Sequence, residues 1–210
     1  MIIAVDGPAA SGKGTIARAL ARHFGLPHMD TGLLYRAAAL NLLRMGLEPD
    51  NEFQAARACD VSQIGFEDPE LRTEAVGGIA SRISAFPLVR QALLERQRHF
   101  AARPGGAVLD GRDIGTVIAP QADAKLFVTA SSEVRAERRR QELAGRGLDV
   151  DLKDVLADIR ARDLRDSGRA AAPLVQAEDA ELLDTSDMDV KAAVAAAIAF
   201  VERRAGARAP

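Results

Sequence analysis

Met1-Ile-Ile-Ala-Val-Asp6 runs without a break into Gly7-Pro-Ala-Ala-Ser-Gly12-Lys13-Gly14-Thr15, and this stretch decides the fold. The apolar run predicts a buried strand. The glycine-rich segment predicts a tight turn whose N–H groups surround phosphate oxygens, with Lys13 as the full positive charge. Ile16–Phe24 predicts a helix whose N-terminus directs partial positive charge at the same phosphates. This order favours a phosphate-binding loop over an ordinary turn between a strand and a helix.

The residue after Lys13 narrows the class of protein. The common form of this loop has Ser or Thr there to hold magnesium, but this chain has Gly14 and brings the hydroxyl at Thr15. The run G-K-G-T resembles the loop of nucleoside monophosphate kinases. A guanine-nucleotide switch is not expected, because neither Asn nor Thr is anywhere followed by Lys. The loop residues predicted to bind ATP are Gly7, Pro8, Ala9, Ala10, Ser11, Gly12, Lys13, Gly14 and Thr15.

Composition bounds the remaining possibilities. A chain of 210 residues that is 48% hydrophobic can bury one substantial core. The formal net charge of −2 argues against nucleic-acid binding by bulk electrostatics. Of the 28 basic residues only four are lysine, and arginine suits phosphate because of its planar fork, although compositional bias accounts for most of the arginines.

Cysteine and histidine usage points to a cytoplasmic enzyme. Cys59 is the single cysteine, so no internal disulfide is expected. No signal sequence precedes the first strand and no apolar stretch is long enough to cross a bilayer, so we expect no membrane partner. His23, His28 and His99 lack metal-ligand spacing and are interpreted as structural or surface residues. We expect a monomer.

Further apolar runs alternate with helical sequence. Strands are predicted at Ala107–Asp110, Ala124–Thr129 and Glu181–Asp184. The fold predicted is α/β, with a three-layer parallel sheet of about five strands of the P-loop NTPase type. Ligands bind beyond the carboxyl ends of such strands, which is where Asp6 and Asp110 fall.

Two excursions from this single domain of residues 1–210 are predicted. Residues 37–103 are mostly helical, with Ile64–Phe66 as a possible short strand, and are interpreted as an acceptor-binding insertion. Residues 144–152 contain a glycine-rich break and are interpreted as a lid, with a plain helix–helix connection as the alternative.

Helices are predicted on both sides of that break and at the end of the chain. The first two span Ser132–Ala144 and Asp151–Ser167. A final helix begins at Met188 or Asp189 and ends at Arg204, with Ala205–Pro210 as a frayed tail.

The ends of the predicted strands carry candidate chemistry. Asp110 follows an apolar run, the usual place for a carboxylate that orients magnesium and its waters, so Asp110 and Thr15 are the predicted metal residues. Arg112 and Asp113 leave the same strand end. A phosphate acceptor is already ionised and needs positive charge rather than a general base. Several arginines stand at predicted strand ends and helix starts, where they could contact phosphate, and this favours a nucleotide acceptor.

One helix face combines acids and arginines. Asp158, Arg162, Asp166 and Arg169 are spaced by four, four and three residues, so they share a face if the helix continues. A solvated face of ion pairs is the ordinary interpretation. The basic side chains before the glycine-rich break are candidate lid cations, namely Arg135, Arg138, Arg139 and Arg140.

Six motifs occur in order along nearly the whole chain: G-P-A-A-S-G-K-G-T, D-T-G-L-L-Y-R, L-R-T-E, A-S-R-I-S-A-F-P-L-V-R, L-D-G-R-D-I-G-T-V and R-D-L-R-D-S-G-R-A-x-A-P-L. Together they resemble the bacterial cytidylate kinase family. The chain departs from that family in a shorter stretch before Leu71, and in Leu164 and Ser167-Gly168, where the family has more charge.

The resemblance implies transfer of the ATP γ-phosphoryl group to CMP or dCMP, with magnesium. It implies that Ser81, Arg90 and Asp113 read the cytosine edge, and the other implied CMP contacts are Thr31, Arg36, Arg112, Arg162, Asp166 and Arg169. The implied catalytic residues are Lys13, Arg112, Arg162 and Asp110, while Arg135 and Arg139 join the loop in binding ATP. The alternatives are another small-molecule kinase, of shikimate or dephospho-coenzyme A type, and a non-catalytic nucleotide-dependent regulatory module.

Overall fold

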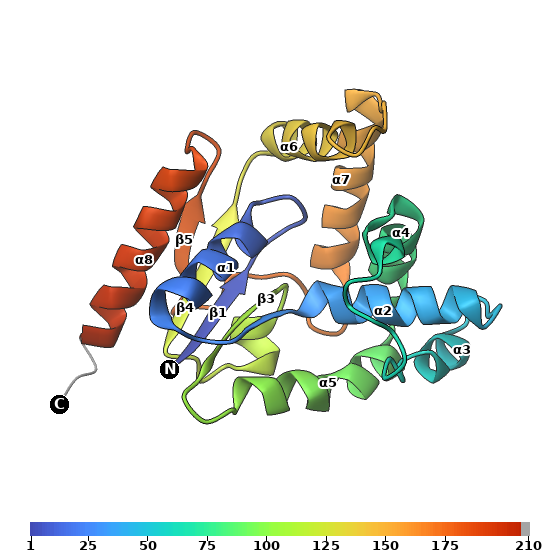
Figure 1. The fold of residues 1–210 in the computed structure, drawn as a ribbon, viewed down its shortest axis with the longest axis horizontal. Helices are drawn as coiled ribbons and strands as arrows, with labels where there is room; N and C mark the ends of the chain where they lie inside the picture. Colours follow the sequence, from blue (N-terminus) through green and yellow to red (C-terminus); the bar gives the residue numbers. More distant parts are fainter. Residues whose placement is uncertain (207–210) are drawn as a thin grey trace.

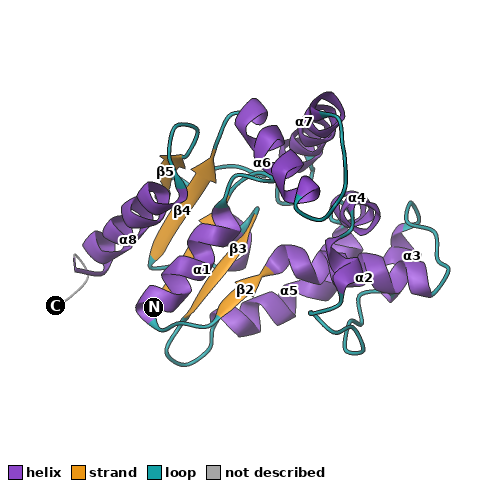
Figure 2. Ribbon diagram, turned by 45° about the horizontal axis from the view of Figure 1, so that its top comes forward, coloured by secondary structure: helices purple, strands orange, loops and turns teal. Residues whose placement is uncertain are grey.

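A computed structural model describes residues 1–206 and contains one five-stranded parallel sheet with the strand order β2-β3-β1-β4-β5 (Figure 1). The strands span Ile2–Asp6 (β1), His28–Asp30 (β2), Ala107–Gly111 (β3), Ala124–Thr129 (β4) and Glu181–Asp184 (β5). Helices cover both faces, as Figure 2 shows most clearly. The predicted three-layer α/β fold is therefore confirmed.

The central strand is apolar because both of its faces are covered. Ile3, Ala4 and Val5 of β1 are fully buried, and β1 pairs in parallel with β3 on one side and β4 on the other. One face packs against α1 (Lys13–Phe24) and α8 (Val190–Gly206). This register brings the ends of β1 and β3 side by side, with Asp6 opposite Gly111.

The fifth strand of the sheet was not among the predicted strands. Ile64–Phe66, predicted as a possible short strand of the insertion, forms no strand, because Ile64 and Phe66 pack into a cluster of helices. The edge strand is β2, whose His28 and Asp30 stand opposite Val108 and Asp110 of β3. Its three residues are too few to produce a recognisable apolar pattern.

The helices between β2 and β3 build a second core. They span Thr31–Arg44 (α2), Glu52–Arg57 (α3), Pro69–Arg72 (η1), Glu74–Ile83 (α4) and Pro87–Ala101 (α5). Leu40, Leu71 and Ile83 are buried together in a cluster separate from those that line the sheet. Residues 31–106 contain no strand. The division at residues 37 and 103 stays an interpretation.

The helices of the last third lie close to their predicted bounds. Helix α6 spans Ser132–Ala144, as predicted, and α7 spans Leu152–Gly168. Ser131 and Asp151 are excluded from these helices because their side chains accept hydrogen bonds from backbone N–H groups of the first turn. Helix α8 includes residues 205 and 206 of the predicted tail, whereas residues 207–210 lie outside the described part of the chain.

Candidate functional site

The loop after β1 can be built only with glycine at its first position. A Cβ on Gly7 would lie 2.0 Å from the carbonyl oxygen of Val128, and Gly12 has a φ of 90°. Helix α1 begins directly at Lys13, whose Nζ donates to the carbonyl oxygen of Pro8 over 3.2 Å. The lysine side chain thus folds back over the loop, with its charge above the helix N-terminus.

Burial makes the positive charge of Lys13 costly in the free protein. Its pKa is lowered from 10.5 to about 8 by burial first and by the charge of Arg112 next, while Asp110 and Asp30 work in the opposite direction. The two carboxylates do not offset the effect of burial on Lys13. A polyanion bound in the loop would add the negative charge needed to stabilise the protonated lysine. The buried hydroxyl of Ser11, which has no hydrogen-bond partner in the described structure, is a further sign of an incomplete site.

A groove beside the loop, here called the loop groove, continues toward the end of the chain. It is lined by loop residues, by Arg138 and Arg139 of α6, and by residues 185–190. Thr185 donates to the carbonyl oxygen of Ser11 over 3.2 Å, and Arg138 donates to the carbonyl oxygen of Thr185 over 2.7 Å. The sequence alone did not identify this part of the groove, because acids such as Asp187 and Asp189 are common at an ordinary helix start.

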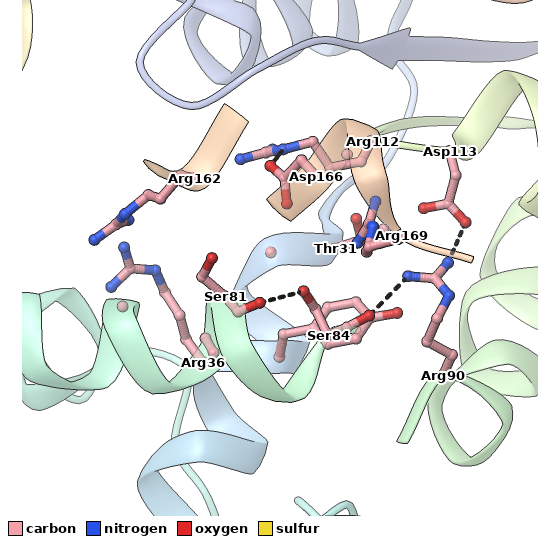
Figure 3. Close-up of a pocket in the computed structure, with 15 residues that line it drawn as sticks. Thr31, Arg36, Ser81, Ser84, Arg90, Arg112, Asp113, Arg162, Asp166 and Arg169 are labelled. Carbon is pink, nitrogen blue, oxygen red and sulfur yellow. Dashed lines mark hydrogen bonds and ion pairs between the residues drawn. The ribbon is translucent and has the colours of Figure 1, made fainter. Parts of the chain in front are cut away.

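A second pocket, here called the arginine pocket, lies between α2, α4, α7 and the end of β3 (Figure 3). The structure brings together here every side chain for which the resemblance implied a CMP contact. Besides glycines and Ala80, its lining consists of Thr31, Tyr35, Arg36, Ser81, Ser84, Arg90, Arg112, Asp113, Arg162, Asp166 and Arg169.

Cations crowd one end of the arginine pocket. Arg36 and Arg162 face one another there in Figure 3. Arg36 donates to the carbonyl oxygens of Leu71 and Thr73 and lies so close to Gly77 that a Cβ there would be 2.7 Å from its guanidinium group. The pKa of Arg36 is lowered to about 10, first by burial and next by the charges of Arg139 and Arg162. This end suits a phosphate group.

The opposite end of the pocket carries a buried acid. Asp113 forms a close ion pair with Arg90, whose Nη1 also donates to the carbonyl oxygen of Ser84. Arg90 lies 5.9 Å from the ring centre of Tyr35. Burial raises the pKa of Asp113, and the charges of Arg90 and Arg169 oppose that rise. The pair offers a hydrogen-bond acceptor next to a donor, which is the pattern that a cytosine edge requires.

Arg169 lines the pocket with N–H groups that no other side chain or carbonyl group of the described structure accepts from. It is 8% exposed, and its Nε and Nη2 atoms have no hydrogen-bond partner in the described structure. Nearby, Arg112 Nε donates to Asp166 Oδ2 over 2.7 Å, so that arginine is held in place. A buried guanidinium with unused donors is expensive unless a ligand accepts from them.

The predicted acid–arginine face of α7 is divided between the pocket and its surroundings. Asp158 forms an ion pair with Arg162 at 2.7 Å, and Asp166 pairs across the pocket with Arg112. Arg169 lies just beyond the last residue of α7 and has extended backbone, so the helix does not continue through it.

Arg135, which was predicted to bind ATP, does not line the loop groove. Its guanidinium group is buried and donates to the carbonyl oxygens of Ala130 and Ala9 and to both carboxylate oxygens of Asp163. It therefore joins α6, α7 and the loop as a structural brace. Arg139 does line the loop groove, where it contacts Glu74 and Glu142.

Two residues that position the site were missed from the sequence. Asp6 accepts from the backbone N–H groups of Ile114 (2.8 Å) and Gly115 (2.7 Å), which holds the turn carrying Arg112 and Asp113. Burial raises the pKa of Asp6 to about 6. On α7, Arg165 Nε donates to Ser81 Oγ over 3.2 Å. A buried acid at the end of the central strand was the available signal for Asp6.

The predicted metal residues are compatible with magnesium. Thr15 and Asp110 offer hard oxygen atoms at the loop, and Asp110 Oδ2 is 3.6 Å from the position of a Cβ on Gly14. Among residues 1–206, no group of three or more His, Cys, Asp or Glu side chains could hold a metal by itself. Magnesium commonly binds through one or two carboxylates, substrate phosphates and water, and these residues fit that mode.

The loop groove and the arginine pocket both carry positive charge, and they meet at the carboxyl ends of parallel strands. This is the arrangement of a P-loop kinase. The shape agrees with that class: a crystal structure of a gluconokinase from Sinorhizobium meliloti 1021 matches with a TM-score of 0.55 and 17% identity, covering 98% of this chain and 94% of that one. At this identity the likeness shows the fold alone.

The family follows from closer relatives. The model of the family described as cytidylate kinase matches residues 3–203. The cytidylate kinase of Xanthobacter autotrophicus is 64% identical over 98% of this chain and 100% of its own length, and that of Methylocella silvestris is 60% identical over 96% and 94%. The chain belongs to the cytidylate kinase family. In residues 1–206, no helix has both the length and the apolar character needed to cross a membrane.

Proposed function

We propose that this chain transfers the γ-phosphoryl group of ATP to CMP or dCMP, giving ADP and CDP or dCDP, with the acceptor in the arginine pocket and the donor in the loop groove. Family membership supports the reaction. The observation that carries the assignment of the two sites is the pairing of a cationic end with an Asp113–Arg90 end in one pocket.

The acceptor is oriented by the two ends of the arginine pocket. Arg36 and Arg162 receive the phosphate, with Arg112 and Thr31 nearby, while Asp113 accepts from the exocyclic amine of cytosine and Arg90 donates to its ring. Uracil reverses these polarities at the edge, so UMP would present a carbonyl oxygen, another acceptor, to the Asp113 carboxylate in place of the amine donor. Arg169 and Asp166 supply donors and acceptors between the ends, where the ribose lies.

The donor is held by backbone N–H groups of the loop and by Lys13. Thr185 and the residues after it line the far end of the loop groove, and we assign the adenine ring to this end. The phosphates of both nucleotides then meet between Lys13, Arg112 and Arg139. Catalysis consists of positioning and of relief of negative charge, because the ionised acceptor phosphate needs no base.

Magnesium supplies charge neutralisation at the triphosphate when bound, and Thr15 and Asp110 are the residues proposed to hold it, through water. The chain's own groups orient the reaction. Lys13 and Arg112 hold the transferring phosphoryl group in line between donor and acceptor. Arg162 stabilises the negative charge of that group from the acceptor side.

Residues 144–152 are proposed to act as a lid. Arg146 of this segment donates to the carbonyl oxygen of Arg72, next to the loop groove. Closure of the segment would exclude water from the transferring phosphate. Residues 37–103 are proposed as the acceptor-binding insertion. We propose that the enzyme works as a monomer in the cytoplasm.

The test is ADP release from ATP and magnesium with CMP, dCMP, UMP, AMP, GMP and shikimate offered separately. We expect turnover with CMP and dCMP and at least about tenfold lower kcat/KM with UMP. Faster turnover with another acceptor would contradict the assignment of the arginine pocket. Nucleotide binding without turnover of any acceptor would favour a regulatory module.

A further inference from the structure

His28 forms a buried contact that neither the loop nor the arginine pocket requires. Its Nε2 lies 2.7 Å from Asp110 Oδ1, and the two side chains are 17% and 3% exposed. A carboxylate can only accept, so Nε2 carries the hydrogen and the histidine donates. The contact joins edge strand β2 to the end of β3, at the residue proposed to face magnesium.

The two oxygens of Asp110 face different surroundings. Oδ1 accepts from His28, whereas Oδ2 lies toward the start of α1, 3.6 Å from where a Cβ of Gly14 would stand. The backbone carbonyl oxygen of Asp110 accepts from Thr31 Oγ1 over 2.8 Å. Main chain and one carboxylate oxygen are thus fixed, which leaves the other oxygen aimed at the loop.

The neighbouring acid does not perform this task. Asp30 stands opposite Asp110 in the strand register, but its Oδ1 accepts from the N–H of Leu33 and caps α2. Among the described residues, the imidazole of His28 is the group that donates a hydrogen bond to the Asp110 carboxylate, and it therefore sets the rotation of that carboxylate. Such outer contacts orient metal-facing groups, and their loss typically costs about 10- to 100-fold in metal affinity or activity.

We propose that His28 is a positioning residue that holds Asp110 Oδ1 and so directs Oδ2 toward the metal–triphosphate in the loop. The inference rests on the proposed function for the identity of that ligand. The proposal concerns only how this chain orients its own carboxylate. It gives a role to His28, a residue of edge strand β2 that was interpreted from the sequence as a structural or surface residue because it lacks metal-ligand spacing.

The test uses the affinity of a non-hydrolysable ATP analogue, AMP-PNP, measured by calorimetry with magnesium and again with EDTA. The ratio of the two affinities is the metal-dependent gain. We expect His28→Leu to reduce this gain at least tenfold while the affinity measured in EDTA stays within about twofold. His28→Gln keeps an N–H at the distance of Nε2 and should restore most of the gain.

A double-mutant cycle separates positioning from a general structural role. If His28 acts through Asp110, then His28→Leu should cause no further loss of the gain in an Asp110→Asn background. A full metal-dependent gain in His28→Leu, or additive losses in the double variant, would overturn the proposal. Absence of CMP turnover by the wild-type enzyme would contradict the proposed function. It would not change the AMP-PNP binding ratios, which test the role of His28 separately.

Discussion

The loop groove and the arginine pocket, proposed as the donor and acceptor sites, are built by different means. The loop uses consecutive residues, backbone N–H groups and one lysine, and its geometry depends on the absence of side chains at Gly7 and Gly12. The arginine pocket uses long side chains from α2, α4, α5, α7 and the turn after β3. Backbone N–H groups contact only the phosphates and so do not distinguish one base from another, whereas side chains around a base can select it by its edge.

The largest effect is expected in the loop. Lys13→Ala removes the nearest full charge from the triphosphate, and we predict a loss of at least about a thousandfold in kcat. Steady-state kinetics with CMP measures it. Lys153→Ala, which changes an exposed lysine of α7, is the matched control and should keep the wild-type rate. Near-normal turnover in Lys13→Ala would contradict the assignment of the loop.

The next effect sharpens the contrast in selectivity. Asp113→Asn replaces the obligate acceptor by an amide that can present either polarity, so we predict that the CMP to UMP ratio of kcat/KM falls at least about tenfold. The control is Asp50→Asn, whose carboxylate pairs with Arg82 on the surface. An unchanged ratio would place base selection elsewhere.

A smaller effect separates stability from binding within the arginine pocket. Arg169→Met removes two buried donors that have no hydrogen-bond partner in the described structure, and it also removes a charge that faces Asp166 and Asp113. These two effects oppose one another, so we predict a change of at most about 1 kcal/mol in the free energy of unfolding together with at least tenfold weaker CMP binding. Urea unfolding and calorimetry measure the two quantities. Arg160→Met on the exposed side of α7 is the control. Loss of both stability and binding would show that Arg169 is structural.

The smallest predicted effect is the uptake of part of a proton by Lys13 when ATP binds. Because the pKa of Lys13 is lowered to about 8, the free enzyme loses this proton as pH rises through 8, and a bound triphosphate should restore it. We predict uptake of a fraction of a proton on ATP binding near pH 8.5, where the ATP phosphates are already ionised. Calorimetry in buffers of different ionisation enthalpy measures the uptake, which should vanish in Lys13→Met.

The same shift sets the sign of a stability effect. The unfolded chain keeps the Lys13 proton up to a pKa of about 10.5 and therefore binds more protons than the folded chain between pH 8 and 10.5. The contribution of Lys13 to the free energy of unfolding consequently rises with pH in this window. Comparison of wild type with Lys13→Met removes the other titrating groups. A contribution that falls with pH would contradict the assigned shift.

The contrast between the two sites also explains what the sequence could predict. The loop, β1, β4 and α6 were predictable because each depends on consecutive residues whose pattern expresses local rules. Strand β2 was not, since its three residues carry no periodic signal. The ion-pair spacing on α7 could not reveal that Asp166 meets Arg112 across the pocket.

For the arginine pocket, resemblance to a family supplied what spacing could not. The pocket joins Arg36 to Arg162 and Arg90 to Asp113 over long separations in the chain, and no local rule connects such residues. Long-range contacts also account for the role of Arg135, whose buried contacts with Asp163 and Ala9 appear only when α6 and α7 pack together.

The most direct measurement is the affinity of each ligand in two variants, taken separately by calorimetry. We predict that Lys13→Ala loses most of its affinity for AMP-PNP with magnesium while it binds CMP within about threefold of wild type. Asp113→Asn should lose at least tenfold in CMP affinity and bind AMP-PNP normally. If either substitution weakened both ligands to the same extent, the division into a donor site of backbone and an acceptor site of side chains would be wrong.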